Sequence, residues 1–171
     1  MRRPTILIFV LLLAISCVSP SSADSAASVR KTLQALYDRS NQAFGRRDLQ
    51  SAYSIFDPSC TIVDQNGRSA GTESLYSTME RYVAAAKTCH SVTRILKCTV
   101  ATVRSVETAT VITTDTTTIV YRGTDGAWTN LKLTAKARDY WAHAANGWKI
   151  LQNYTMSEQE WMNGQKVDTD Q

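Results

Sequence analysis

The stretch Trp128-Thr-Asn-Leu-Lys-Leu-Thr-Ala-Lys-Ala-Arg-Asp-Tyr-Trp-Ala-His143 alternates between apolar and polar side chains. Its odd positions are Leu131, Leu133, Ala135, Ala137, Asp139, Trp141 and His143, and its even positions include Asn130, Lys132, Thr134, Lys136 and Arg138. Because successive side chains of a strand point to opposite faces of a sheet, this period of two predicts a long strand with one buried face. Asp139 falls on that face, so its carboxylate is expected to be hydrogen-bonded, charge-paired or partly protonated.

Further extended segments lie on both sides of this strand. They are rich in Val, Ile and Thr and cover about 92–106, 109–122 and 148–156. Gly- and Asn-containing turns separate them, as expected for neighbouring strands. We interpret the seven threonines between Thr108 and Thr118 as the surface of a sheet. Ser157-Glu-Gln-Glu160 has capping-box spacing and predicts a short helical turn.

Helical patterns come before these strands. The first covers about 24–45 and places its apolar side chains on one face: Val29, Leu33, Leu36, Tyr37 and Phe44. Asp48 is expected to cap a short second helix that stops at Asp57-Pro58, and Thr72 a third. A short strand is predicted over 60–64. Helices followed by a strand meander indicate an α+β fold, with a bent, mainly antiparallel sheet around the long first helix.

Several local strings, in this order, resemble the nuclear transport factor 2-like superfamily and its SnoaL-like and ketosteroid-isomerase-like bacterial domains. They are FGRRDLQSAYSIFD (44–57), TIVDQNG (61–67) with Gly71, DYW (139–141) and GWKI (147–150). The resemblance covers nearly all of residues 24–171. It implies a cone-shaped, cystatin-like fold with an apolar pocket at one end, and a homodimer formed through the sheet.

The resemblance also suggests candidate catalytic residues. Asp64 stands where isomerase-like members carry a general base, and Asp139 near their oxyanion-stabilising acid. The tyrosine of their first helix is replaced by Ser40, and Tyr37, one turn earlier, is the candidate substitute. Asp64 also fits a turn-capping role before Asn66-Gly67, and Asp139 a structural hydrogen-bond network.

Two functions follow from this resemblance. The first is an apolar pocket that binds a small apolar molecule in a binding or accessory role, with Tyr53, Trp141 and His143 as candidate contacts. The alternative is a cofactor-independent isomerase, dehydratase or cyclase, in which Asp64 moves a proton and Asp139 or Tyr37 stabilises an oxyanion. Trp141 and Tyr53 also fit a purely structural role in the core.

The N-terminus has the pattern of a secretory signal. Arg2 and Arg3 precede an unbroken apolar run over 6–15, and small residues follow. We expect residues 1–23 to be removed and the protein to be exported to the periplasm or the extracellular space. An alternative is a lipoprotein signal that ends at Ser16, in which case lipidated Cys17 anchors the protein to a membrane.

Composition excludes several other classes of protein. The net charge is only +4, and no cluster of Lys and Arg is longer than a pair such as Arg46-Arg47, so no nucleic-acid partner is expected. Only two histidines occur and no Cys-x-x-Cys motif, so we expect neither a metal nor another cofactor. Cys60, Cys89 and Cys98 allow one disulfide and one free thiol, or small buried residues at Cys60 and Cys98.

Overall fold

A long helix, α1 (Ala23–Gly45), begins the part of the chain that the computed structural model describes, residues 23–167. The expected signal over 1–23 and the lipidation site Cys17 lie outside these residues, apart from Ala23 itself. Three short elements and a third helix follow α1: α2 (Leu49–Tyr53), β1 (Phe56–Val63), β2 (Ser69–Gly71) and α3 (Thr72–Ala84). Within 23–167, no helix is both long and apolar enough to cross a membrane.

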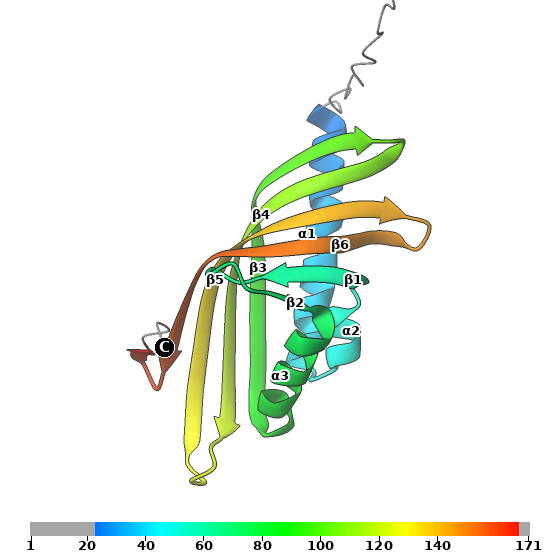
Figure 1. Ribbon diagram of the computed structural model, residues 1–171. Helices are drawn as coiled ribbons and strands as arrows, with labels where there is room; N and C mark the ends of the chain where they lie inside the picture. Colours follow the sequence, from blue (N-terminus) through cyan, green and yellow to red (C-terminus); the bar gives the residue numbers. More distant parts are fainter. Residues whose placement is uncertain (1–22, 168–171) are drawn as a thin grey trace, which may run out of the picture.

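Four long strands and a short one complete the chain: β3 (Ala86–Val103), β4 (Val106–Arg122), β5 (Trp128–Ala144), β6 (Gly147–Met162) and β7 (Gln165–Val167). The sheet has the order β2-β1-β6-β5-β4-β3, with β7 paired to β6. All pairings are antiparallel except that of β1 with β6, so the sheet is mixed. Figure 1 shows the long strands curving around α1, with α2 and α3 near its C-terminal end. The predicted α+β fold is confirmed.

The alternation along β5 is confirmed by burial. Leu131, Ala137, Asp139 and Trp141 are all at most 4% exposed, whereas Lys132, Lys136 and Arg138 on the opposite face are exposed. His143 shares the parity of the buried set but lies exposed near the strand end, where its ring stacks on Trp148 with centroids 5.1 Å apart. The period of two thus predicted the buried face of this strand.

The predicted helices occur where they were expected, but the ends of α2 and α3 differ from the prediction. Val29, Leu33 and Tyr37 are buried at a spacing of four residues, which sets α1 against β3. The Asp48 carboxylate accepts the Ser51 N–H at 3.1 Å and caps α2, as predicted. α2 ends at Tyr53, however, because the chain turns into β1 at Phe56 before it reaches Asp57-Pro58. Gly71, rather than Thr72, occupies the N-cap of α3.

One prediction for this part of the chain is wrong, and another is only partly right. Ser157–Glu160 form no helical turn, because β6 continues through them and pairs with β5 from Lys136 to Leu133. The threonine run of β4 is not only sheet surface: Thr113 is 1% exposed, and Thr117 faces inward on the same side. At Ser157–Glu160 the hydrogen-bonded ladder with β5 overrides the local capping signal, whereas the threonine run does form a strand as its β-branched residues predict.

The core consists of two clusters of buried side chains. One gathers around Leu33, Val111 and Trp141, and the other around Phe44, Ile119 and Leu131. The three cysteines of the described chain are free thiols, with Cys60 and Cys89 buried and Cys98 half-buried. This matches the expectation of small buried residues better than that of a disulfide.

Candidate functional site

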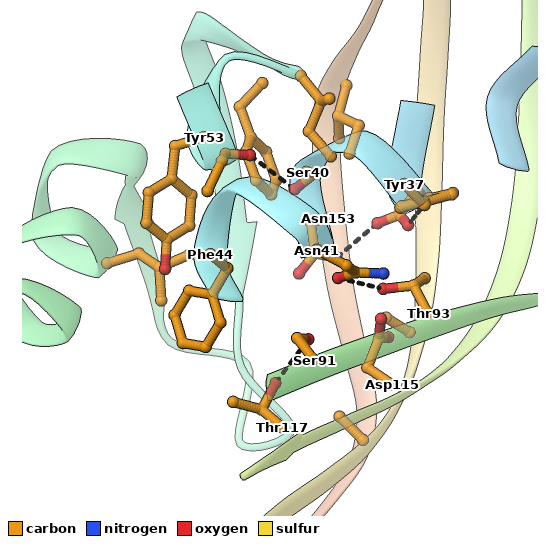
Figure 2. A pocket seen from close by; sticks show the side chains of 18 of the residues that line it. Tyr37, Ser40, Asn41, Phe44, Tyr53, Ser91, Thr93, Asp115, Thr117 and Asn153 are labelled. Carbon is orange, nitrogen blue, oxygen red and sulfur yellow. Dashed lines mark hydrogen bonds between the residues drawn. The ribbon is translucent and has the colours of Figure 1, made fainter. Parts of the chain in front are cut away.

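A cavity of about 250 Å³ is lined by members of both core clusters. Its walls come from α1, α2, α3 and the inner face of the sheet, and they are mainly apolar. The apolar lining consists of Phe44, Ala52, Tyr53, Ile55, Phe56, Ile62, Leu75, Met79, Leu133, Ala135, Ala137 and Ile150. Figure 2 shows Phe44 and Tyr53 on one side of this pocket and the polar residues of α1 and the sheet on the other.

A buried hydrogen-bonded chain closes one part of the cavity wall. The Trp141 indole Nε1–H donates to the Tyr37 hydroxyl oxygen at 3.2 Å, and the Tyr37 hydroxyl donates to Asp139 Oδ2. The Asn153 side-chain amide donates to the other carboxylate oxygen, Oδ1. The rings of Tyr37 and Trp141 also meet edge-to-face, with centroids 5.3 Å apart. Asp139 is therefore held from α1 and β6 as well as by its own strand.

These contacts set the protonation of the buried pair. Burial raises the pKa of Asp139 to about 6, although the hydrogen bonds from Tyr37 and Asn153 oppose the shift. Burial and the neighbouring Asp139 charge raise the pKa of Tyr37 well above 10, so its hydroxyl keeps its proton. At neutral pH Asp139 is mostly ionised and accepts hydrogen bonds, and in the bond that joins the two residues the Tyr37 hydroxyl is the donor.

A second carboxylate, Asp115 on β4, lies half-buried in the same cavity. The Thr113 hydroxyl donates to Asp115 Oδ2 at 3.0 Å, and the Thr93 hydroxyl on β3 is also within hydrogen-bond reach of this carboxylate. Burial raises the pKa of Asp115, and the two hydroxyls oppose the shift. In Figure 2, Asp115 lies beside Thr93 and below Asn41, whose side-chain oxygen is 3.4 Å from the Thr93 hydroxyl.

Further polar groups line the sheet side of the cavity. Ser91 and Thr117, cross-strand neighbours on β3 and β4, share a hydrogen bond of 2.9 Å. Ser40 of α1 donates to the Ala52 carbonyl at 2.7 Å and so ties α1 to α2. The arrangement combines an apolar enclosure with a few convergent polar groups, which is the usual composition of a small-molecule site.

No protein-family profile and no curated protein matches the sequence. Solved structures do match. A scytalone dehydratase-like protein from Novosphingobium aromaticivorans is 9% identical, with a TM-score of 0.63 over 88% of this chain and 99% of its own. LinA is 12% identical, with a TM-score of 0.57 over 84% of this chain and 92% of its own. A domain with a cystatin-like fold from Nostoc punctiforme is 11% identical, with a TM-score of 0.50 over 78% of each chain.

This chain has a cystatin-like fold. The resemblance to nuclear transport factor 2-like and SnoaL-like domains inferred from the sequence is thereby confirmed for the fold, which is all that identities this low establish. One of the similar solved structures is a dehydratase-like protein. One fold hosts many functions, so the function has to be argued from the residues of the cavity.

The predicted catalytic residues are only partly brought together. Tyr37 and Asp139 meet in the cavity wall, but Asp64 lies outside it, in an exposed turn. The Asp64 carboxylate accepts the backbone N–H groups of Asn66 and Arg68, each at 2.9 Å, and pairs with the Arg68 side chain at 2.7 Å. These bonds lower its pKa, which is the geometry of the turn-capping alternative.

The three residues predicted to contact a ligand, Tyr53, Trp141 and His143, do not lie in one site. Tyr53 lines the cavity, and burial raises the pKa of its hydroxyl. Trp141 is 1% exposed and stands behind Tyr37 as its hydrogen-bond donor, outside the cavity lining. His143 lies in a different surface depression with Trp148 and Lys149.

The sequence analysis missed most polar residues of the cavity, among them Asn41, Asp115 and Asn153. One signal for Asp115 was present, because it shares strand parity with Val111, Thr113 and Ile119, all of them buried. Asn41 follows Tyr37 by one helical turn. Within the described residues, no group of three or more His, Cys, Asp or Glu side chains is arranged to hold a metal ion.

Proposed function

We propose that this protein binds a small, largely apolar molecule in the cavity between α1, α3 and the sheet. The carrying observation is the asymmetry of the cavity wall: apolar side chains form most of it, and the oriented carboxylates of Asp115 and Asp139 lie on the sheet side. The apolar side chains would remove the apolar part of a ligand from water, and the carboxylates would orient the ligand through its polar groups.

The size and chemistry of the cavity limit the ligand. Its volume of about 250 Å³ lies below the roughly 300 Å³ at which drug-sized pockets begin, so the ligand is smaller than a typical drug molecule. The carboxylates accept hydrogen bonds, and a ligand that offers an N–H or O–H donor to them is therefore favoured.

The proposal places this binding outside the cytoplasm. It is supported by residues 1–23, in which positive charge is followed by an apolar run and then by small residues, as in a secretory signal. Lipidation at Cys17, which would attach the protein to a membrane, is the alternative. The resemblance to nuclear transport factor 2-like domains supports a homodimer formed through the sheet.

Native mass spectrometry of the protein purified from its own host tests the binding proposal. We expect an additional mass of one small molecule that is released on denaturation. Ala137→Leu adds bulk to the cavity wall and should abolish this mass, whereas the control Thr134→Leu, on the opposite face of β5, should retain it. Equal retention by both folded variants would place the ligand elsewhere and refute the proposal.

An enzyme of the isomerase, dehydratase or cyclase kind is the second candidate. It is favoured by one observation, the raised pKa of Asp139 in a cavity wall, because a base is most effective when its pKa approaches the working pH. Asp64 is not among the residues that line the cavity, and its carboxylate is engaged by the backbone N–H groups of Asn66 and Arg68 and by the Arg68 side chain, so this candidate does not use it as the base. In this candidate Asp139 takes a proton from a carbon next to a carbonyl and returns it to another atom of the same molecule, which needs no cofactor.

Solvent exchange distinguishes the two candidates. The molecule identified by native mass spectrometry is incubated with the protein in heavy water, and deuterium in the recovered molecule is counted. An enzyme would accelerate deuterium incorporation or, where the abstracted proton is returned without exchange, formation of an isomerised or dehydrated product, and Asp139→Asn would reduce that rate by roughly 100- to 10,000-fold, the range attributed to general acid–base catalysis. If neither incorporation nor product formation is faster than in the protein-free control, the enzyme is excluded and the binding function is left.

A further inference from the structure

The charges that line the cavity are all negative. Asp115, Asp139 and Glu158 contribute carboxylates, and no Lys, Arg or His occurs among the described residues that line it. Within residues 23–167, neither Asp115 nor Asp139 has an ion-pair partner. Carboxylates in the interior of proteins are usually paired with a positive charge. In this cavity the protein supplies neutral hydrogen-bond donors to Asp115 and Asp139 in place of a positive charge.

The two inner carboxylates differ in how accessible they are. Asp139 is 2% exposed and is already engaged by Tyr37 on one oxygen and Asn153 on the other. Asp115 is half-buried, is held in place by the Thr113 hydroxyl, and lies beside Thr93 at the cavity wall (Figure 2). Asp115 is therefore the more accessible of the two carboxylates to a ligand in the cavity.

We propose that the molecule bound in this cavity is an amine, with a protonated nitrogen at Asp115 and an apolar body against Phe44, Tyr53 and Ile62. This inference rests on the binding function proposed above and adds the charge of the ligand. An ammonium group supplies the missing positive charge and donates hydrogen bonds, for which Asp115 and the oxygen of Asn41 are acceptors. A carboxylate or phosphate ligand would meet like charge without a cation to receive it.

Three probes that share a phenyl ring with one attached carbon and differ in charge test this inference on the unmodified protein. Benzylamine is a cation at neutral pH, benzyl alcohol is neutral, and benzoate is an anion. Binding is measured by isothermal titration calorimetry at pH 7.5. We expect benzylamine to bind about tenfold more tightly than benzyl alcohol, because hydrogen bonds to a charged group are about twice as strong as neutral ones. Benzoate should bind most weakly.

Variants locate the effect. Asp115→Asn keeps a hydrogen-bond acceptor for Thr113 and should reduce benzylamine binding to the level of benzyl alcohol. Asp38→Asn removes the same charge from the exposed face of α1 and should change neither affinity. The comparison of the three probes on the unmodified protein does not depend on whether either variant folds.

Each contrary outcome has a distinct meaning. If benzyl alcohol or benzoate binds as tightly as benzylamine, or if the preference survives Asp115→Asn, the amine inference is refuted while the binding function stands. If none of the probes binds and Ala137→Leu retains the host molecule, the binding function is refuted together with the inference.

Discussion

The substitution Asp139→Asn separates the charge of this buried carboxylate from its shape. Asparagine keeps an oxygen for the Tyr37 hydroxyl, and the Asn153 amide can rotate to accept from the new NH₂ group. In the wild-type protein, burial raises the pKa of Asp139 from 3.8 to about 6. The folded state therefore binds the proton more tightly than the unfolded state between these two values, and the stability of the wild type falls as the pH rises through this window.

The magnitude follows from the pKa difference. At 1.36 kcal/mol for each pKa unit, the ionisation of Asp139 costs roughly 3 kcal/mol in total and about 2 to 3 kcal/mol between pH 4 and pH 7. Asp139→Asn has no such dependence, so its stability relative to the wild type should rise by that amount over the same range. Other titrating groups are common to both proteins and cancel in the comparison.

Urea unfolding followed by tryptophan fluorescence at pH 4, 5.5 and 7 measures this difference. A relative stability that stays constant with pH would show that the folded pKa of Asp139 is not raised. A relative stability that falls with increasing pH would show that the folded pKa of Asp139 is lowered, as in a stabilising paired carboxylate, and would refute the raised pKa.

Three further predictions concern other parts of the molecule. Tyr37→Phe removes a donor from Asp139, which should cost about 1–3 kcal/mol in urea unfolding and raise the pKa of Asp139 further; an unchanged pKa by NMR titration would contradict the hydrogen-bonded chain. Asp64→Asn changes only the exposed turn and should leave ligand binding intact, whereas lost binding would return Asp64 to the site. Intact mass of the protein from its host should show a start at residue 24, a lipid-modified Cys17 would select the anchored form, and a start at Met1 would refute export.

The fold was largely predictable from the sequence because its main signals are periodic. The alternation of β5 and the four-residue spacing of Val29, Leu33 and Tyr37 both result from the burial of one face of an element. Such burial leaves a periodic pattern of apolar residues that can be recognised in the sequence. Ends of elements were less predictable. The capping-box spacing at Ser157 is a local signal, and the pairing of β6 with β5 outweighs it.

The candidate site was only half predictable for a related reason. Asp139 was identified because a single carboxylate interrupts an apolar face. Asp115 has the same parity argument, but the surrounding threonines suit either face of a strand and conceal which side is buried. Asp64 was selected because it stands where isomerase-like members carry a general base, and the turn-capping alternative was also evident from Asn66-Gly67. The backbone groups of Asn66 and Arg68, once placed, show the geometry of that alternative.

The location of the bound molecule is the most direct test of the proposed function. Chemical-shift changes of backbone amides are mapped by NMR during titration with benzylamine or benzyl alcohol, whichever binds more tightly. We predict that the largest changes occur at the cavity wall, at Thr93, Asp115 and Ala137. Changes confined to the outer face of β5, at Lys132 and Lys136, or no changes at all would contradict a ligand site inside the curved sheet.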